Sequence, residues 1–397
     1  MIQHWKPLRS TGARAAQRRF SPKTAVLVLL TGLVAMAAEP SSSWTIGVVD
    51  GSLGGDSSSL QIDKFGNAHV AYEGQGVLQY SFWDHNLKRW FTMNVDKTVG
   101  FCSMALDSKQ RPHISYPQFG PLRYAHWDGS SWQKETIAVP SQETTFYTSI
   151  SLDRDDNPSI SYYEHVLGSE ETLRMRVVAK EANVWKLRTV DATRGSGKFN
   201  SVAVDSAGRP HIAYANVLYE NSSLRYAFWD GKRWNREILE GEGMPGTYRQ
   251  AVMLILDKHD NPHIAYSDVL NQIAKYATKA NGKWSIEEVD PIGRAAYPDR
   301  NGIALDEDGT PYISYYDEQN GILKVAHKVN QKWVTEVVDE GFAGYTSSLQ
   351  IHDGIIWLTY SGGAGSGLKF ARRPIPTTAT ATRSQVLSSP GNTPGAR

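Results

Sequence analysis

The feature that most constrains the fold of this chain is a tryptophan that recurs seven times at similar intervals. The series is Trp44, Trp90, Trp132, Trp185, Trp234, Trp284 and Trp333, with intervals of 42 to 53 residues. Six positions after the tryptophan, all copies but one have an acidic residue, as in Trp44 and Asp50; the third copy has Ala138. A repeat of this length indicates a solenoid, a propeller or another array of small structural units.

Each repeat contains four short segments with the pattern of β-strands. One segment ends in Leu-Asp or a relative, and a turn then leads into a variant of His-Ile-Ala-Tyr, as at 211–214 and 263–266. Both segments alternate with period two, as strands do. A segment with Leu-x-Tyr-Ala follows, and Asp-Gly, as at 128–129 and 230–231, marks a tight hairpin into the next tryptophan segment. The sequence therefore predicts an all-β chain, a seven-bladed β-propeller of four-stranded antiparallel blades.

The repeats are out of phase with the ends of the predicted domain. The first tryptophan segment, Trp44 to Asp50, has no partner strands before it, and the last repeat, 346–372, has no tryptophan segment. We therefore expect the N-terminal strand to complete the last blade and close the ring, which removes exposed sheet edges. The expected propeller domain spans residues 44–373.

The two ends of the sequence differ from the repeats. Residues 1–37 contain six basic residues and no acid, and the apolar run 25–38 ends in small residues. This pattern predicts a signal peptide over 1–37, and hence a secreted, periplasmic or cell-surface protein without a membrane span after cleavage. An uncleaved membrane anchor is the alternative, although the run is shorter than the about 20 residues of a spanning helix. Residues 374–397, rich in Thr, Ser and Pro, predict a disordered tail.

Charge and cysteine content exclude some classes of protein. Without the six basic residues of 1–37, the 42 Lys and Arg residues become 36 against 41 acidic residues, a net charge of −5. This balance argues against a nucleic-acid partner, which favours a basic face. Cys102 is the only cysteine, so we expect no internal disulfide and a buried thiol. We also expect a monomer.

Metal binding is not expected from the recurring histidines. Equivalent positions of a ring lie far apart, whereas metal ligands converge within about 2 Å of one ion, so these histidines predict a structural role and no cofactor. Calcium is the alternative, because Asp306-Glu307-Asp308-Gly309 and 153–157 resemble calcium loops. Both lack the spaced downstream acid of an EF-hand, and a β-turn explains them.

The complete repeat also resembles a known group of proteins. Asp-x-x-Gly-x-Pro-His-Ile-Ala-Tyr, followed by Leu-x-Tyr-Ala-x-Trp-Asp-Gly-x-x-Trp, is similar to uncharacterised secreted bacterial propellers, loosely grouped with sialidase-like, BNR-repeat proteins. The resemblance covers about residues 44–373 and implies the fold. It does not imply one function, because propellers include lectins, hydrolases, lyases and protein-binding scaffolds. The Ser-x-Asp-x-Gly-x-Thr-Trp box of sialidases is absent, which argues against sialidase activity.

Residues that break the repeat are the better candidates for a ligand site. An aromatic residue precedes the first strand of six blades: Phe101, Tyr147, Phe199, Tyr248, Tyr297 and Tyr345. Aromatic rings there would stack on sugars or pack between blades, and for the first three, which are in register, we expect packing. Blades five and six also replace a recurring serine by Met253 and Gly302.

Charged residues gather near these two replacements. Arginine binds carboxylates through paired hydrogen bonds, so an acidic glycan or a peptide carboxylate is the expected ligand. The predicted ligand-binding residues are Tyr248, Arg249, Tyr297, Asp299 and Arg300. The alternative is that the charged residues form salt bridges between blades.

Two acidic residues that follow the second strand are the catalytic candidates. Asp268 and Asp317 lie in neighbouring blades, and glycoside hydrolysis uses two carboxylates about 5–9.5 Å apart; repeated acids are more often structural. The leading hypothesis is therefore a non-catalytic recognition module that binds a glycan or a protein at or outside the cell envelope. The alternatives are a polysaccharide hydrolase or lyase that uses the rim of blades five and six, and a structural scaffold of an envelope assembly.

Overall fold

The computed structural model describes residues 43–375, except for 53, 56, 99, 119, 138–142, 167–171, 219–221, 245–248, 293–300 and 364. The expected signal peptide and almost all of the expected tail lie outside the described residues. Within this part of the chain, no helix is long and apolar enough to cross a membrane.

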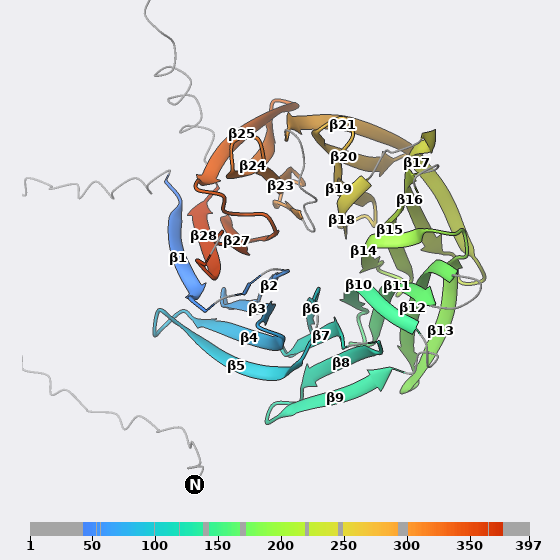
Figure 1. The fold of residues 1–397 in the computed structure, drawn as a ribbon, viewed down its shortest axis with the longest axis horizontal. Coiled ribbons are helices and arrows are strands. Elements are labelled where there is room, and N and C mark those ends of the chain that lie inside the picture. The colour runs from blue at the N-terminus through green and yellow to red at the C-terminus, as the bar shows by residue number, and fades with distance from the viewer. Residues whose placement is uncertain are drawn as a thin grey trace, which may run out of the picture. The chain divides into compact units, whose positions relative to one another are not determined.

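The described chain forms seven four-stranded antiparallel sheets arranged in a ring, which confirms the predicted seven-bladed β-propeller (Figure 1). The inner strands, one for each of blades 1 to 7, are β2 (Ser59–Ile62), β6 (Ser103–Leu106), β10 (Glu143–Leu152), β14 (Ser196–Val204), β18 (Arg249–Leu256), β22 (Gly302–Leu305) and β26 (Ser347–His352). The second strands are β3 (Ala68–Gly74), β7 (Pro112–Pro117), β11 (Pro158–Val166), β15 (Pro210–Asn216), β19 (Pro262–Asp268), β23 (Pro311–Asp317) and β27 (Ile355–Ser361).

Two further strands complete each blade towards the outside. The third strands are β4 (Val77–Asp84), β8 (Leu122–Trp127), β12 (Thr172–Glu181), β16 (Ser222–Trp229), β20 (Ile273–Ala280), β24 (Ile322–Val329) and β28 (Leu368–Pro374). The outer strands are β5 (Arg89–Lys97), β9 (Trp132–Ile137), β13 (Val184–Asp191), β17 (Trp234–Met244), β21 (Lys283–Pro291), β25 (Lys332–Asp339) and, in blade 7, β1 (Thr45–Asp50).

Blade 7 takes its outer strand from the start of the domain, as the sequence predicts. β1 pairs with β28, and Thr45 lies opposite Arg372 in the antiparallel register. The order in this sheet is β1-β28-β27-β26, so the chain closes its own ring. The closing strand brings the first and last blades together and gives blade 7 the same four strands as the other blades.

Burial follows the position of a strand in its blade. The second strands are almost wholly buried, whereas the outer strands are exposed or half-buried and become buried only near their last residues. The core lies between neighbouring blades; one cluster, for example, joins Ala71 and Leu78 of blade 1 to Ile114 and Tyr116 of blade 2. The His-Ile-Ala-Tyr variants are therefore the centre of each blade, which explains their frequency.

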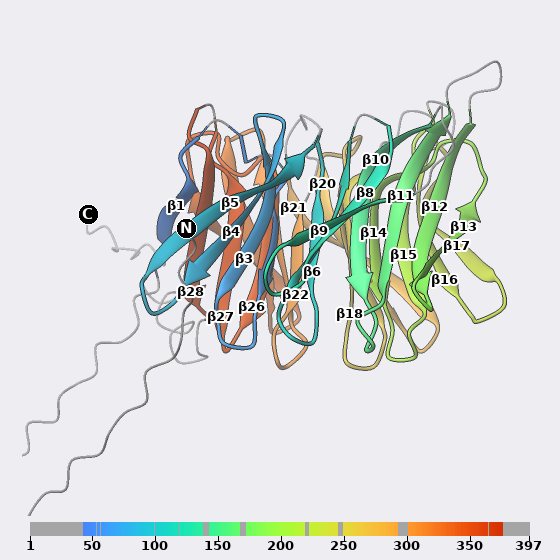
Figure 2. The ribbon, with the colours of Figure 1, turned by 90° about the horizontal axis from the view of Figure 1, so that it is seen from below.

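The strands run between two opposite faces of the ring (Figure 2). Connections from an outer strand to the next inner strand form one face, here called the mouth face, together with the hairpins between second and third strands. The turn face is formed by the other two hairpins of each blade, such as 63–67 and 85–88. These names are kept below.

Candidate functional site

A channel on the axis of the ring is the main cavity of the propeller. Residues of all seven inner strands line it, and its volume is about 320 Å³. The serine that recurs in the inner strands uses its hydroxyl to join neighbouring blades: Ser59 accepts a hydrogen bond from the Met104 N–H at 3.0 Å, and Ser103 from the Ile150 N–H at 3.2 Å. Ser149, Ser201 and Ser348 do the same towards Val202, Leu254 and Leu60.

Blades 5 and 6 interrupt this chain of serine hydrogen bonds. Met253 and Gly302 occupy the two serine positions and have no hydroxyl to offer to the next blade. At Gly302 there is also no room for a side chain, because a Cβ atom would lie 2.6 Å from the Leu349 Cβ and 2.7 Å from the Leu349 nitrogen. The lining of the channel is therefore asymmetric. The part without the serine hydroxyls belongs to blades 5 and 6, the two blades in which the sequence repeat is broken.

A row of aromatic rings lies at the mouth-face end of the channel. The rings of Phe101 and Tyr147 are stacked with their centroids 5.0 Å apart, and Tyr147 lies 4.6 Å from Phe199. With Thr148, Asn200 and Val252 they line a small hollow that borders the channel at Met253. The sequence predicted that these three rings pack together, and the ring contacts confirm it; Phe101 and Tyr147 are nevertheless only half-buried.

The backbone under this row is in an uncommon conformation. Tyr147 and Phe199 have φ angles of 50° and 48°, and each lies at an irregularity in the strand register. A left-handed conformation is rare for a bulky residue. Ser57 and Ala251 adopt the same conformation at the equivalent positions of blades 1 and 5. The bulge therefore needs no aromatic side chain, and the rings of blades 2 to 4 require another explanation.

The catalytic candidates Asp268 and Asp317 are buried and occupied by contacts within the protein. Asp268 is 3.0 Å from the Lys275 ammonium, and Asp317 is 2.7 Å from that of Lys324. Each also accepts hydrogen bonds from the asparagine three residues later, which closes the hairpin between the second and third strands. Neither is more than 2% exposed. This geometry supports a structural role for both carboxylates.

The charges around Asp317 favour its ionised form. Burial raises the pKa of Asp317, but the hydrogen bonds from Lys324 and Asn320 outweigh it, so that the pKa is lowered overall. The same lysine also contacts Asp290 of the preceding blade at 2.9 Å. A general acid would need a raised pKa and contact with a substrate. Asp317 has a lowered pKa and a buried side chain, so it meets neither requirement.

Most of the predicted ligand-binding residues lie outside the described residues. This applies to Tyr248, Tyr297, Asp299 and Arg300. Arg249 is the first residue of β18, and its backbone lies opposite Asp268 in β19. Their role in ligand binding stays a prediction.

The recurring histidines are bound within their own blades. The Nδ1 atoms of His69, His113, His211 and His263 lie 2.5–2.6 Å from tyrosine hydroxyls of the third strands, and their Nε2 atoms face an aspartate at 3.3–3.7 Å. The tyrosines are Tyr80, Tyr124, Tyr226 and Tyr276. Blades that lack the histidine have Val177, Val325 or Phe370 instead of the tyrosine. The histidine and the tyrosine therefore form one structural unit.

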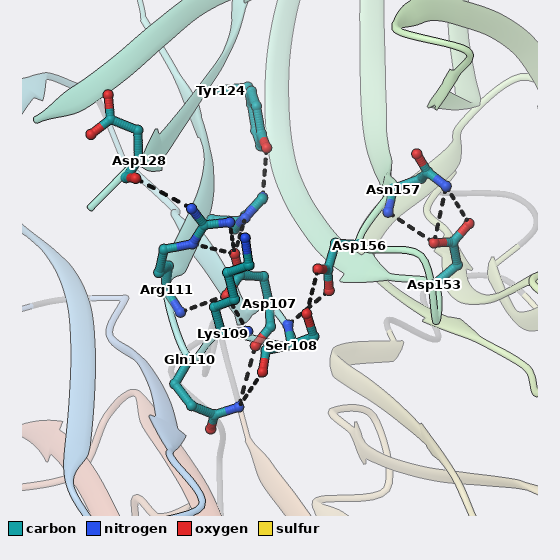
Figure 3. A network of polar contacts seen from close by, with 11 residues as sticks. Asp107, Ser108, Lys109, Gln110, Arg111, Tyr124, Asp128, Asp153, Asp156 and Asn157 are labelled. Atoms are coloured by element: carbon teal, nitrogen blue, oxygen red, sulfur yellow. Dashed lines mark hydrogen bonds and ion pairs between the residues drawn. The ribbon is translucent and has the colours of Figure 1, made fainter. Parts of the chain in front are cut away.

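The aspartates of the turn face hold the hairpins that aim the second strands. Asp107 accepts hydrogen bonds from the backbone of Lys109 and Arg111, and Ser108 binds Asp156 of the next blade (Figure 3). The two segments considered as calcium loops, 153–157 and 306–309, are such hairpins. In the first, Asp153 accepts hydrogen bonds from the backbone of Asp155 and Asn157. Among the residues that the structure describes, no three His, Cys, Asp or Glu side chains gather to hold a metal.

Comparisons with known proteins show the fold and no closer relationship. No protein-family model matches the chain, and no curated protein matches its sequence. Virginiamycin B lyase from Staphylococcus aureus matches with a TM-score of 0.57 at 7% identity, over 84% of this chain and 100% of that chain. A polysaccharide lyase, an ulvan lyase, matches with 0.55 at 12% identity, over 83% and 98%.

A third match is a fungal propeller lectin, the fucose-recognising lectin of Aleuria aurantia. Its TM-score is 0.49 at 14% identity, over 72% of this chain and 95% of that chain. The similarities to the two lyases agree with the β-propeller fold of this chain. Identities this low show the fold alone, and the likeness to sialidase-like repeats stays a prediction.

Proposed function

We propose that this propeller is a non-catalytic recognition module that binds a glycan at its mouth face and works outside the cytoplasm, as a secreted, periplasmic or cell-surface protein. The observation that carries the proposal is the row of Phe101, Tyr147 and Phe199 at the end of the channel. Two of these rings stay half-exposed, although serine or alanine is sufficient at the same bulge in other blades.

Aromatic rings suit a sugar ligand for a physical reason. Ligand sites combine apolar and aromatic walls with a few polar groups that fix orientation. The mouth supplies the aromatic wall; Thr148 and Asn200 beside it are buried and hydrogen-bonded within the protein. Backbone strain at Tyr147 and Phe199 is of the kind that collects at ligand sites. A rigid ring of seven sheets also holds these residues in place before the ligand arrives.

We further propose that the connections 245–248 and 293–300 complete this site. They join an outer strand to the next inner strand, as does the connection that carries Phe101, so we expect them to contribute to the same face. Tyr248, Arg249, Tyr297, Asp299 and Arg300 would then contact the same ligand and give it a preference for acidic groups. The buried, ion-paired state of Asp268 and Asp317 supports binding without chemistry.

The test is to incubate the purified protein with neutral and acidic polysaccharides and to follow the size of each polysaccharide by chromatography. The proposal predicts that at least one polysaccharide elutes at larger size without becoming shorter. The double variant Phe101→Ala/Tyr147→Ala should weaken that binding at least tenfold. The matched control is Phe65→Ala, which removes a 70% exposed ring from the turn face and should leave binding unchanged.

Two results would overturn the proposal. Shortening of a polysaccharide over time would establish an enzyme instead. No change in any elution profile would reject the glycan and favour a protein partner.

A further inference from the structure

The seven junctions between blades use two different arrangements on the turn-face side of the outer strands. Three positions define each junction. Two belong to one blade: the recurring tryptophan of its outer strand and the residue paired with that tryptophan on the third strand. The third position belongs to the preceding blade and lies three residues after the tryptophan of that blade. At four junctions the opposite residue is basic and the preceding blade supplies a glutamate. These sets are Lys180 with Glu135, Lys279 with Glu237, Lys328 with Glu287 and Arg373 with Glu336.

In three of these four junctions the glutamate binds two donors at once. Glu237, for example, accepts hydrogen bonds from Lys279 at 2.6 Å and from the indole N–H of Trp284 at 2.6 Å. Glu135 and Glu287 bind the indoles of Trp185 and Trp333 in the same way, at 2.9 and 3.0 Å. A lysine, an indole and a carboxylate together seal the gap between two blades.

The other three junctions lack both the basic residue and the glutamate but keep the recurring tryptophan. The residue opposite it is a second tryptophan, Trp83, Trp127 or Trp229, and the preceding blade offers Gly47, Met93 or Arg188. In two of them apolar or sulfur atoms fill the space: Trp90 packs against Phe370, and the indole of Trp132 donates to the Met93 sulfur at 3.3 Å.

The junction of blades 3 and 4 is different, because a cavity of about 200 Å³ opens there. Residues of its wall include Trp229 and Trp234, whose rings are 5.5 Å apart, and Arg188, whose guanidinium lies 5.5 Å from the Trp229 ring. The buried indole nitrogen of Trp234 has no acceptor among the residues that the structure describes. An unsatisfied buried N–H is costly, and a ligand oxygen would remove that cost.

The wall of this cavity offers one replaceable ion pair and one unsatisfied donor, the Trp234 indole. Arg188 pairs with Glu181 at 2.5 Å, but the two side chains are 32% and 48% exposed. Exposed ion pairs contribute little stability, so a ligand carboxylate can replace Glu181 at low cost. Lys180, Arg209 and Asp153 also line the wall, but the two cations among them are already paired with carboxylates of the protein, so Arg188 is the cation that a ligand can bind. The ligand that fits must therefore bring acceptors and a negative charge.

We propose that this cavity is a second saccharide site, specific for a uronic acid residue. Arg188 binds the carboxylate, the indole N–H of Trp234 binds a hydroxyl or ring oxygen, and the aromatic wall contacts the sugar ring. The volume is below the roughly 300–1,000 Å³ of sites for drug-sized ligands, which suits one sugar residue. The site lies on the turn face, opposite the mouth, and does not depend on the function proposed above.

Binding of D-glucuronic acid to the purified protein tests this site, with D-glucose as the neutral counterpart. Tryptophan fluorescence and ligand-observed NMR measure the two affinities, and glucuronic acid should bind at least tenfold more tightly than glucose. The variant Arg188→Glu/Trp229→Lys rebuilds the sealed junction found at Glu237, Lys279 and Trp284. It should fold, as judged by circular dichroism, and lose the binding of glucuronic acid.

The matched control makes the same change at a junction that Met93 fills. Met93→Glu/Trp127→Lys should leave the binding of glucuronic acid unchanged, and so should the mouth variant Phe101→Ala/Tyr147→Ala, which separates this proposal from the previous one. Trp234→Phe, which removes the indole N–H and keeps a smaller aromatic ring, should weaken binding about tenfold and tests the site if Arg188→Glu/Trp229→Lys does not fold. Equal affinity for glucose and glucuronic acid would reject the site. Unchanged binding of glucuronic acid by both Arg188→Glu/Trp229→Lys and Trp234→Phe would also reject it.

Discussion

The hydroxyl of Tyr72 donates a hydrogen bond of 2.7 Å to the carboxylate of Asp50, across the point where the ring closes. Tyr72 belongs to the first blade, and Asp50 ends the strand that completes the last. The same contact joins five other junctions: Tyr116–Asp96, Tyr214–Asp191, Tyr266–Glu240, Tyr315–Asp290 and Tyr360–Asp339. The recurring tyrosine of the second strand and the acid that follows six of the seven tryptophans are thus two halves of one inter-blade bond.

Asp50→Ala should destabilise the propeller, because it leaves the buried hydroxyl of Tyr72 without this carboxylate. The cost expected for a buried polar group that loses its partner is about 1–3 kcal/mol. Chemical denaturation followed by tryptophan fluorescence measures it. Asp308→Ala is the control, since Asp308 is exposed and has an ordinary backbone conformation, and it should change the free energy of unfolding by less than about 0.5 kcal/mol. Equal effects of the two substitutions would contradict a role for Asp50 in ring closure.

The fold could be predicted from the sequence because each strand carries its own local pattern. Period-two alternation, Asp-Gly turns and the recurring tryptophan define all four strands of a blade without any knowledge of the neighbouring blade. Ring closure also followed, because the unpaired strand at Trp44 and the incomplete repeat after 346 complement each other. The aromatic row was visible as residues that precede the inner strands.

The sites could be predicted only in part, because they depend on contacts between blades. Asp268 and Asp317 looked like rim carboxylates, but Lys275 and Lys324 on the next strand bind them. The cavity between blades 3 and 4 was missed. Its signal is in the sequence, since Arg188 replaces a glutamate of other repeats, but the meaning of that change depends on Trp229, 41 residues later.

Restoring the recurring serine should cost more stability in blade 6 than in blade 5, the two blades that lack it. Gly302→Ser should destabilise the protein by about 1–3 kcal/mol, because its Cβ would lie 2.7 Å from the backbone nitrogen of Leu349. Met253→Ser removes a larger side chain that lines the channel and introduces the hydroxyl used at five other junctions, so its cost should be smaller. Thermal unfolding of both variants decides the point. A Gly302→Ser variant as stable as the natural protein would show that the close approach of blades 6 and 7 is wrong.

The paired histidine and tyrosine of blade 2 should behave as one unit. His113→Tyr alone leaves the Tyr124 hydroxyl without its partner, and Tyr124→Val alone leaves a cavity beside His113. The double variant reproduces the pair found in blade 6, Tyr312 and Val325, and should be more stable than the two single effects predict. Interaction energies between residues in contact are about 0.5–3 kcal/mol. A double-mutant cycle from urea denaturation measures this value, and strict additivity would contradict the unit.

Stability should fall as the pH is lowered from 6.5 to 4, because of the buried histidines. Burial lowers the pKa of His113 and of His327 from 6.5 to about 4, and burial also lowers the pKa of His211 and of His263. Between pH 6.5 and 4 the unfolded chain therefore binds protons that the folded chain does not. The free energy of unfolding rises with pH wherever the unfolded state binds more protons, so lowering the pH through this window favours unfolding.

The size and the origin of this pH effect can be separated by one variant. A shift from 6.5 to about 4 corresponds to about 3 kcal/mol for one histidine. His113→Tyr/Tyr124→Val removes one such group, so its loss of stability between pH 6.5 and 4 should be smaller than that of the natural protein. Below pH 4 the two proteins should lose stability in parallel, because carboxylates with lowered pKa values, such as Asp63 at about 2, then take up protons in the unfolded chain first. Parallel curves above pH 4 would instead assign the effect to groups other than His113.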